Sequence, residues 1–239
     1  MDKQTQLDAL KDEIIAHDIC KHMRETATQL VMGAGNPDAD IVLIGEAPGK
    51  QEDEQGLPFV GASGKFLDEM LAAADMNRDD IYITNIVKYR PPNNRDPAPE
   101  EKQAFWPYLM RQLEIIDPRV IITLGRHSGS AFVPDLKISR DHGHGRTLRY
   151  RRQAGVDAVQ GAGEPRTEAY DEYSEGAVET ATQQRATSHG RVIGSTDEQA
   201  VVTWLVVPLY HPAAALYNGG MRQALLDDFV AAAELARAK

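Results

Sequence analysis

A short apolar run that ends in a glycine-rich turn limits the possible folds of this chain more than any other feature. Residues Ile41-Val42-Leu43-Ile44 are consecutive apolar side chains, mostly β-branched, a pattern typical of a strand buried on both faces of a sheet. Gly45-Glu46-Ala47-Pro48-Gly49 follows and ends the strand in a tight turn. On these residues alone, the turn is either a phosphate-binding loop or a simple connection from a strand to a helix.

Strands and helices alternate along most of the chain. Apolar patterns predict further strands at 81–87, ending near Asn85, at 120–124 and at 201–207. They predict helices at about 5–28, 63–74, 100–116 and 222–238. This alternation predicts an α/β fold, a three-layer α/β/α sandwich with a central, mainly parallel sheet. For a chain of 239 residues we expect a single domain spanning 1–239.

One segment breaks the alternation. Residues from about 139 to 200 are rich in Gly, Thr, Gln and Arg and show little periodicity. Because a structureless stretch of this length is unusual inside a compact domain, we interpret it as an insertion with a flexible centre. Its flanks at 146–150 and 201–207 are expected to pair as a hairpin.

Composition excludes several classes of protein. No run approaches the roughly 20 apolar residues of a membrane span and the N-terminus lacks a signal pattern, so we expect a cytoplasmic protein. The single cysteine, Cys20, excludes an internal disulfide and an all-cysteine metal site within one chain. The net charge of −10 argues against a generally basic nucleic-acid coat, although a local basic stripe is enough for phosphate contacts.

Polar groups stand where three of the predicted strands end: Glu46, Asn85 and His211. Taken singly, each has an ordinary explanation as a turn acid, a cap or a loop histidine. The carboxyl ends of parallel strands meet at one edge of a sheet, so together these residues predict a binding site there. Phe59, in a Pro-Phe-Val-Gly turn, is either a core residue or a platform for a ligand.

Several ordered motifs closely resemble the uracil-DNA glycosylase superfamily, and within it the fourth, thermostable type. The similarity covers about 18–126 and about 206 to the end, and the insertion lies outside it. The motifs are Gly45-Glu46-Ala47-Pro48-Gly49 with Glu52-Asp53, Gly56-x-Pro58-Phe59-Val60-Gly61, Ile83-Thr84-Asn85-Ile86-Val87-Lys88, Arg90-Pro91-Pro92 with Asn94-Arg95, and His211-Pro212-Ala213.

The resemblance implies an enzyme of base-excision repair that flips deoxyuridine out of DNA and hydrolyses its N-glycosidic bond. It implies a uracil pocket formed by Glu46, Ala47, Pro48, Phe59, Asn85 and His211. Phe59 would stack on the base, and the Asn85 amide would read the O4 and N3–H groups of uracil. His211 and the backbone near Ala47 would stabilise the uracil anion.

Glu46 and His211 are the implied catalytic residues. Glu46 would stabilise the cationic sugar and orient water, and whether it takes a proton or only positions that water stays open at this point. Glu52 would support the site.

The expected partner is uracil-containing DNA, single- or double-stranded, bound by a monomer. Lys88, Arg90 and Arg95 surround a proline-rich loop and are candidates for phosphate contacts. Leu216 is either an apolar wedge that enters the duplex or part of a helix core. The basic start of the insertion either extends the DNA surface or belongs to a tolerated surface loop.

The resemblance also implies a [4Fe–4S] cluster, because the fourth type carries four cysteine ligands. The matching positions here hold Cys20, Met23, Tyr89 and Phe105, so only one thiol remains. We therefore expect neither a metal nor another cofactor. The hypothesis is that Met23, Tyr89 and Phe105 fill the space of the cluster with packed side chains.

Two other functions compete with the enzyme. A non-catalytic homologue that binds uracil or DNA would keep the pocket without turnover, but such a protein should have lost at least one of Glu46, Phe59, Asn85 and His211. A nucleotide-binding protein with a phosphate loop at 45–49 is disfavoured because no Walker-type Lys-Ser/Thr pair follows.

Overall fold

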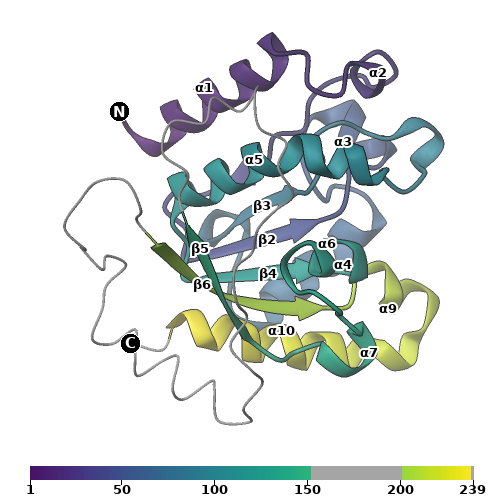
Figure 1. Cartoon of the computed structure of the whole chain (residues 1–239). Coiled ribbons are helices and arrows are strands. Elements are labelled where there is room, and N and C mark those ends of the chain that lie inside the picture. The colour runs from purple at the N-terminus through teal and green to yellow at the C-terminus, as the bar shows by residue number, and fades with distance from the viewer. Residues whose placement is uncertain (152–200, 238–239) are drawn as a thin grey trace.

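The computed structural model describes residues 1–151 and 201–237 and contains a six-stranded sheet (Figure 1). In spatial order the strands are β1 (Ala34–Gly35), β3 (Tyr82–Asn85), β2 (Ile41–Gly45), β4 (Val120–Leu124), β6 (Val201–Leu209) and β5 (Arg146–Arg151). The four central strands are parallel to one another, and each edge strand is antiparallel to the strand beside it. The prediction of a mainly parallel sheet in an α/β fold is therefore confirmed.

Helices cover both faces of this sheet (Figure 1). The long helices are α1 (Lys3–Ala16) and α5 (Pro99–Ile116) on one face, and α4 (Ala62–Ala73) and α10 (Arg222–Arg237) on the other. The short ones are α2 (Lys21–Arg24), α3 (Lys50–Gln55), α6 (Arg126–Phe132), α7 (Ile138–Asp141) and α9 (Ala213–Tyr217), with 3₁₀ turns η1 (Arg78–Asp80), η2 (Pro92–Asn94) and η3 (Gly219–Met221).

The core explains why β2 is apolar at successive positions. Val42 and Ile44 pack with residues of α1 and α5, whereas Ile41 and Leu43 pack with residues of α4 and α10. All four side chains are at most 2% exposed. Burial of each stabilises the fold by about 1.5–3 kcal/mol, so this strand fixes both helical layers and the position of the turn that follows it.

The predicted N-terminal helix is shorter than expected. α1 ends at Ala16, and the chain turns at Asp18 and Cys20, whose φ angles are 56° and 52°. These left-handed conformations cannot continue an α-helix, so the apolar pattern of 5–28 is divided between α1 and α2. Leu7, Leu10 and Ile14 supply the buried face of α1.

Regular structure extends into the predicted insertion. α7 covers its first residues, and β5 pairs with β6, so the expected hairpin is confirmed. Asp141 explains part of this order, because its buried carboxylate pairs with Arg140 and Arg146. The remainder of the insertion, 152–200, lies outside the described residues, and a single domain over 1–239 stays a prediction. Among the helices that the structure describes, none has the length and apolarity needed to cross a membrane.

Candidate active site

The sheet brings the predicted residues together at the carboxyl ends of its parallel strands. Gly45 at the end of β2 lies opposite Asn85 at the end of β3. Two backbone hydrogen bonds extend this pairing beyond the strands, from Ile86 N–H to Gly45 O (3.0 Å) and from Val87 N–H to Glu46 O (3.2 Å). Ala47 is half-buried and Pro48 is buried in the turn that follows.

Gly45 is the point at which Asn85 and Phe59, the residues predicted to read the base, meet. A β-carbon built at Gly45 would lie 2.3 Å from Asn85 Oδ1 and 2.8 Å from the Phe59 ring, closer than real contacts allow. Only glycine therefore lets the Asn85 amide and the Phe59 ring approach each other. The strand-ending glycine is thus required by the geometry of the site as well as by the turn.

Phe59 adopts a backbone conformation that is unusual for its type. Its φ angle is 51°, in the left-handed region, and such strain persists only where neighbouring groups enforce it. The Arg78 guanidinium donates hydrogen bonds to the carbonyls of Phe59 (2.5 Å) and Pro58 (3.2 Å). Gly64 allows the close approach, because a β-carbon there would lie 1.8 Å from Phe59 O. These contacts fix the direction of the ring.

Glu52 connects the two loops that form the site. Its Oε1 accepts hydrogen bonds from the N–H groups of Val60 and Gly61, each 2.9 Å long. Its Oε2 accepts from Gly49 N–H at 3.1 Å. One carboxylate thus holds the end of the turn after β2 against the loop that carries Phe59. This connection is how Glu52 could support the site, as predicted.

His211 is oriented by its own loop. Its Nδ1 accepts a hydrogen bond from Ala213 N–H (3.1 Å), so in the neutral ring the proton is on Nε2. Burial lowers the pKa of His211 to about 4, and the nearby Glu52 carboxylate opposes this shift only in part. The ring lies 5.8 Å from the Phe59 ring between centroids. His211 is therefore a neutral Nε2–H donor at pH 7, next to the predicted stacking residue.

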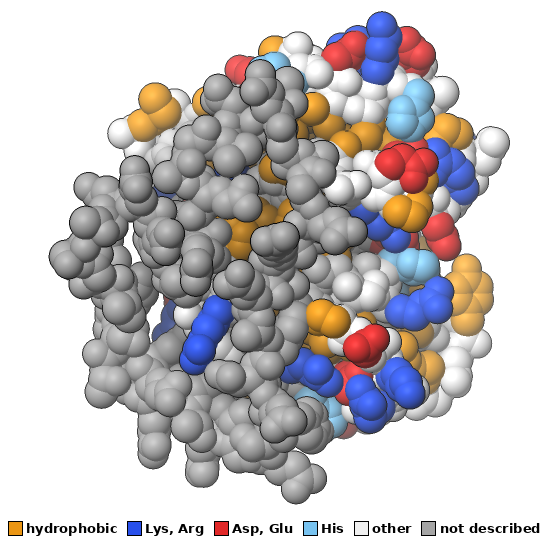
Figure 2. Space-filling model, in the orientation of Figure 1, with side chains coloured by type: hydrophobic (Ala, Val, Ile, Leu, Met, Phe, Trp, Pro, Cys, Tyr) orange, Lys and Arg blue, Asp and Glu red, His pale blue; other side chains and the backbone are white. Residues whose placement is uncertain are grey.

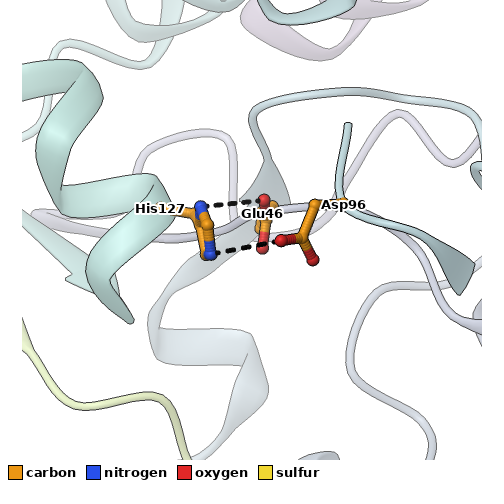
Figure 3. Close-up of side chains that lie close together, drawn as sticks. All are labelled: Glu46, Asp96 and His127. Atoms are coloured by element: carbon orange, nitrogen blue, oxygen red, sulfur yellow. Dashed lines mark ion pairs between the residues drawn. The ribbon is translucent and has the colours of Figure 1, made fainter. Parts of the chain in front are cut away.

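Glu46 lies in a chain of charged side chains (Figure 3). Its Oε1 is 3.2 Å from Lys102 Nζ and 3.4 Å from His127 Nδ1, and His127 Nε2 is 3.6 Å from Asp96 Oδ2. Within the described residues, Oε1 is hidden from solvent and has no hydrogen bond of good geometry, so these contacts are electrostatic. Because Asp96 is largely exposed, its end of the chain is screened by water.

The prediction for Lys88 is wrong. Its side chain is fully buried, and Nζ donates to Thr84 Oγ1 (2.7 Å), Asn85 O (2.8 Å) and Gln112 Oε1 (2.7 Å). Desolvation lowers the pKa of Lys88 to about 7. A group in this position cannot reach a phosphate, and it instead anchors the backbone of the residue expected to read the base.

The other three predicted DNA contacts lie nearer the surface. Arg90 is half-buried and donates to Asn94 Oδ1 (2.7 Å). The Arg95 guanidinium binds both oxygens of the buried Glu101 carboxylate, and its hydrogen bond there is the largest reason that the pKa of Glu101 falls to about 2. Leu216 is 47% exposed, so its reading as helix core is wrong.

The four positions that correspond to cluster ligands share one apolar core. Met23 and Phe105 are fully buried and Tyr89 is 2% exposed, while Cys20 packs against the same core. The rings of Tyr89 and Phe105 meet edge to face at 6.0 Å. An iron–sulfur cluster is held by several thiolates, and this set offers a single thiol. The residues present therefore do not fit the group.

Basic and acidic side chains are interspersed on the described part of the surface seen in Figure 2. No continuous basic stripe is visible on that part, in keeping with the net charge of −10. The chemistry of the site consequently depends on a few placed side chains more than on a general positive field.

Sequence reasoning missed four residues of the site: Arg78, Asp96, Lys102 and His127. His127 carried a usable signal, because it follows Gly125-Arg126 at the end of the strand Val120–Leu124, where the strand-end rule applies. Lys102 and Arg78 carried none, since an isolated basic residue in a helix or a turn is most often a solvated one.

The fold and the site define a class: an α/β protein with a neutral imidazole, a buried amide and an aromatic ring at the carboxyl edge of a parallel sheet. The model of the Uracil DNA glycosylase superfamily matches residues 32–234. The chain belongs to this superfamily.

Three type-4 uracil-DNA glycosylases are similar to the chain. The protein from Sulfurisphaera tokodaii is 37% identical over 236 residues, covering 96% of this chain and 84% of its own length. The protein from Saccharolobus solfataricus is 36% identical over 231 residues, covering 93% and 83%. The protein from Archaeoglobus fulgidus is 54% identical over 120 residues, covering 50% of this chain and 60% of its own length.

Proposed function

We propose that the protein is a uracil-DNA glycosylase that releases uracil from DNA for base-excision repair. The observation that carries the proposal is the meeting of Asn85 and Phe59 at the bare backbone of Gly45, with the His211 ring beside Phe59. These groups suit a flipped base: a ring to stack on, an amide to match its edge and a donor for its leaving oxygen. Family membership and the similar type-4 enzymes support the same activity.

The Asn85 amide would distinguish uracil from cytosine. An amide offers one acceptor and one donor, which suit the N3–H and O4 of uracil. Cytosine has an unprotonated N3 and an amino group at the same edge, so both contacts would be mismatched. Mismatched polar groups in a closed pocket are strongly rejected. The Lys88 ammonium, which donates to Asn85 O (2.8 Å), would keep the amide in its reading position.

His211 would stabilise the leaving group. As the N-glycosidic bond breaks, negative charge builds on uracil O2, and the Nε2–H of the neutral ring would donate to it. The backbone N–H near Ala47 would act as a second donor in the preorganised site. A donor of this kind contributes about 3–4 kcal/mol to transition-state stabilisation in comparable oxyanion sites.

Glu46 would act on the sugar side. Its carboxylate would stabilise the oxocarbenium character of the sugar and orient the attacking water. Outside the pocket, Leu216 and its neighbour Tyr217, which is 91% exposed, would form the wedge that fills the space left by the flipped base. Arg90 remains a candidate for a phosphate contact.

We further propose that the enzyme functions without an iron–sulfur cluster. Packing of Met23, Tyr89 and Phe105 in one core supports this, because these side chains stabilise the same region by burial. Glu101 adds a polar connection, since its carboxylate contacts His22 of α2 (2.6 Å) and Arg95 of the preceding loop. A monomeric state, a cytoplasmic location and the choice between single- and double-stranded DNA stay predictions.

The test is incubation with a uracil-containing oligonucleotide, followed by alkaline cleavage of abasic sites. After alkali, the strand treated with wild-type protein should be cleaved at the uracil position, and the strand treated with an Asn85→Ala, His211→Ala double variant should not. A thymine-containing oligonucleotide is the matched control. Wild-type binding to uracil DNA without cleavage above the double variant would instead favour the non-catalytic homologue.

A further inference from the structure

Two basic side chains approach the same oxygen of Glu46, and they come from different parts of the fold. Lys102 belongs to the first turn of α5, and His127 to the first turn of α6, after the end of β4. Asp96, in the loop before α5, approaches His127 from the other side (Figure 3). In the order Lys102, Glu46, His127 and Asp96, basic and acidic side chains alternate.

The contacts of Glu46, His127 and Asp96 indicate an electrostatic chain and not a metal site. One carboxylate oxygen each of Glu46 and Asp96 and one ring nitrogen of His127 lie within 4.8 Å of one another, which is close enough to share a metal ion. A histidine binds a metal through one nitrogen, however, and here Nδ1 faces Glu46 while Nε2 faces Asp96. The ammonium of Lys102, 3.2 Å from Glu46 Oε1, would also repel a metal cation at that oxygen.

His127 Nδ1, which lies 3.4 Å from Glu46 Oε1, carries a hydrogen in two protonation states. The imidazolium carries a hydrogen on both nitrogens. In the neutral ring, Arg126 Nη2 lies 3.4 Å from Nε2 and favours the tautomer in which Nε2 accepts and Nδ1 carries the hydrogen. Both the imidazolium and this neutral tautomer therefore place an N–H group near Glu46 Oε1.

Burial makes these contacts effective. The side chains of Glu46, Lys102 and His127 are 21%, 26% and 33% exposed, so water screens them less than it screens a surface pair. Both contacts are made to Oε1. The other oxygen, Oε2, is then the one left to face water or the sugar.

We propose that Lys102 and His127 are positioning residues that hold Glu46 Oε1, and that Asp96 steadies His127 when the ring carries both hydrogens. The proposal rests on the catalytic role given to Glu46 under Proposed function. It adds that the Glu46 carboxylate is oriented by the Lys102 ammonium and the His127 imidazole, one on each neighbouring helix. A carboxylate held in this way already has its orientation before the substrate binds. Such preorganisation favours transition-state stabilisation.

A double-mutant cycle tests the proposal. The rate of uracil release would be measured under single-turnover conditions for Lys102→Met and His127→Leu, each in the wild-type and in the Glu46→Gln background. We expect each substitution to lower the wild-type rate roughly tenfold and to change the Glu46→Gln rate less than about twofold, because residues that act through a common partner are not additive. Equal losses in both backgrounds would overturn the proposal.

Conservative variants separate positioning from folding. His127→Asn keeps an N–H donor near the place of Nδ1, and Lys102→Arg keeps the charge, so both should restore most of the rate. Asp96→Asn should lower it only about twofold, because that pair is exposed. Lys21→Met is the matched control, because Lys21 forms an exposed pair with Asp18 at 3.7 Å and has no proposed role in the site. Failure of both conservative variants, with native circular dichroism, would count against the proposal.

Binding of uracil-free duplex distinguishes the proposal from a phosphate contact. Fluorescence anisotropy should give the same affinity and salt dependence for Lys102→Met as for the wild type. A weaker affinity with a shallower salt dependence would assign Lys102 to a phosphate and overturn the proposal. If the wild type releases no uracil, the proposed function is refuted. If the wild type is active but the effects of the substitutions are additive with that of Glu46→Gln, only this inference is refuted.

Discussion

His211 Nδ1 accepts a hydrogen bond from Ala213 N–H at 3.1 Å, and this single contact determines what the ring can donate. With Nδ1 occupied as an acceptor, the neutral ring presents Nε2–H. Burial keeps the ring neutral by lowering its pKa from 6.5 to about 4. The loop after β6 thus supplies an N–H donor that carries no charge of its own at physiological pH, as the proposed stabilisation of the uracil anion requires.

The first prediction concerns the titration of His211. Long-range ¹H–¹⁵N spectra should show the Nε2–H tautomer, with no change between pH 5.5 and 8 and a midpoint near pH 4. Because the folded pKa is lower than the unfolded value, the unfolded state binds more protons between about pH 4 and 6.5. Stability contributed by neutral His211 is therefore present above pH 6.5 and lost as the pH falls toward 4. A midpoint near 6.5 would contradict this.

The second prediction concerns the glycine at the end of β2. Gly45→Ala should displace the Phe59 ring or the Asn85 amide by about 1 Å, which can lower kcat/KM roughly 100-fold. Overpacking should also reduce the free energy of unfolding by about 1–3 kcal/mol. Gly219→Ala is the control, because a β-carbon there meets no atom within 4 Å. Steady-state kinetics and urea unfolding check both, and equal effects of the two substitutions would count against the pocket geometry.

The third prediction concerns Glu52. In Glu52→Gln, one carboxylate oxygen becomes an NH₂ group that cannot accept a hydrogen bond from Gly49, Val60 or Gly61. An unsatisfied donor costs about 1–3 kcal/mol, and kcat/KM should fall with the loss of loop alignment. Glu54→Gln, on the same helix α3, breaks only a surface pair with Lys50 and should change stability by less than about 0.5 kcal/mol. Similar results for both variants would exclude a role for Glu52 as a connection.

The fourth prediction concerns the buried Lys88. Its folded pKa, about 7, is lower than the unfolded value of 10.5, so the unfolded state binds more protons between these limits. The wild type should therefore gain stability over Lys88→Met as the pH rises from 7 to 10, by up to about 1.4 kcal/mol per pH unit. Urea unfolding across this range measures it, with the exposed Lys65→Met as the matched control. A pH-independent difference would mean that Lys88 is charged throughout.

The layers of the fold were predictable because apolar runs of β-branched residues have few alternatives. Ile41–Ile44 and Val120–Leu124 could only be buried strands, and helical patterns between them required a parallel sheet. The meeting of Glu46, Asn85 and His211 followed from that topology. Local backbone conformation was harder to predict, since the left-handed residues Asp18 and Cys20 divide a continuous apolar pattern.

Side-chain direction limited the prediction of the site. Lys88 stands beside a basic, proline-rich loop in the sequence, yet its side chain turns into the core toward Thr84 and Gln112. Lys102 and His127 reach Glu46 from two helices, and no sequence spacing reports that approach. Such contacts depend on how helices pack over a sheet edge, which composition and periodicity do not specify.

The most direct check of a uracil-DNA glycosylase without a cluster is a paired measurement on one anaerobically purified sample. Iron and sulfide would be quantified, and uracil release from a uracil-containing oligonucleotide would be followed on the same protein. We expect uracil release that requires Asn85 and His211, at substoichiometric iron and without brown colour. Stoichiometric iron and sulfide, or no uracil release above the Asn85→Ala, His211→Ala variant, would contradict it.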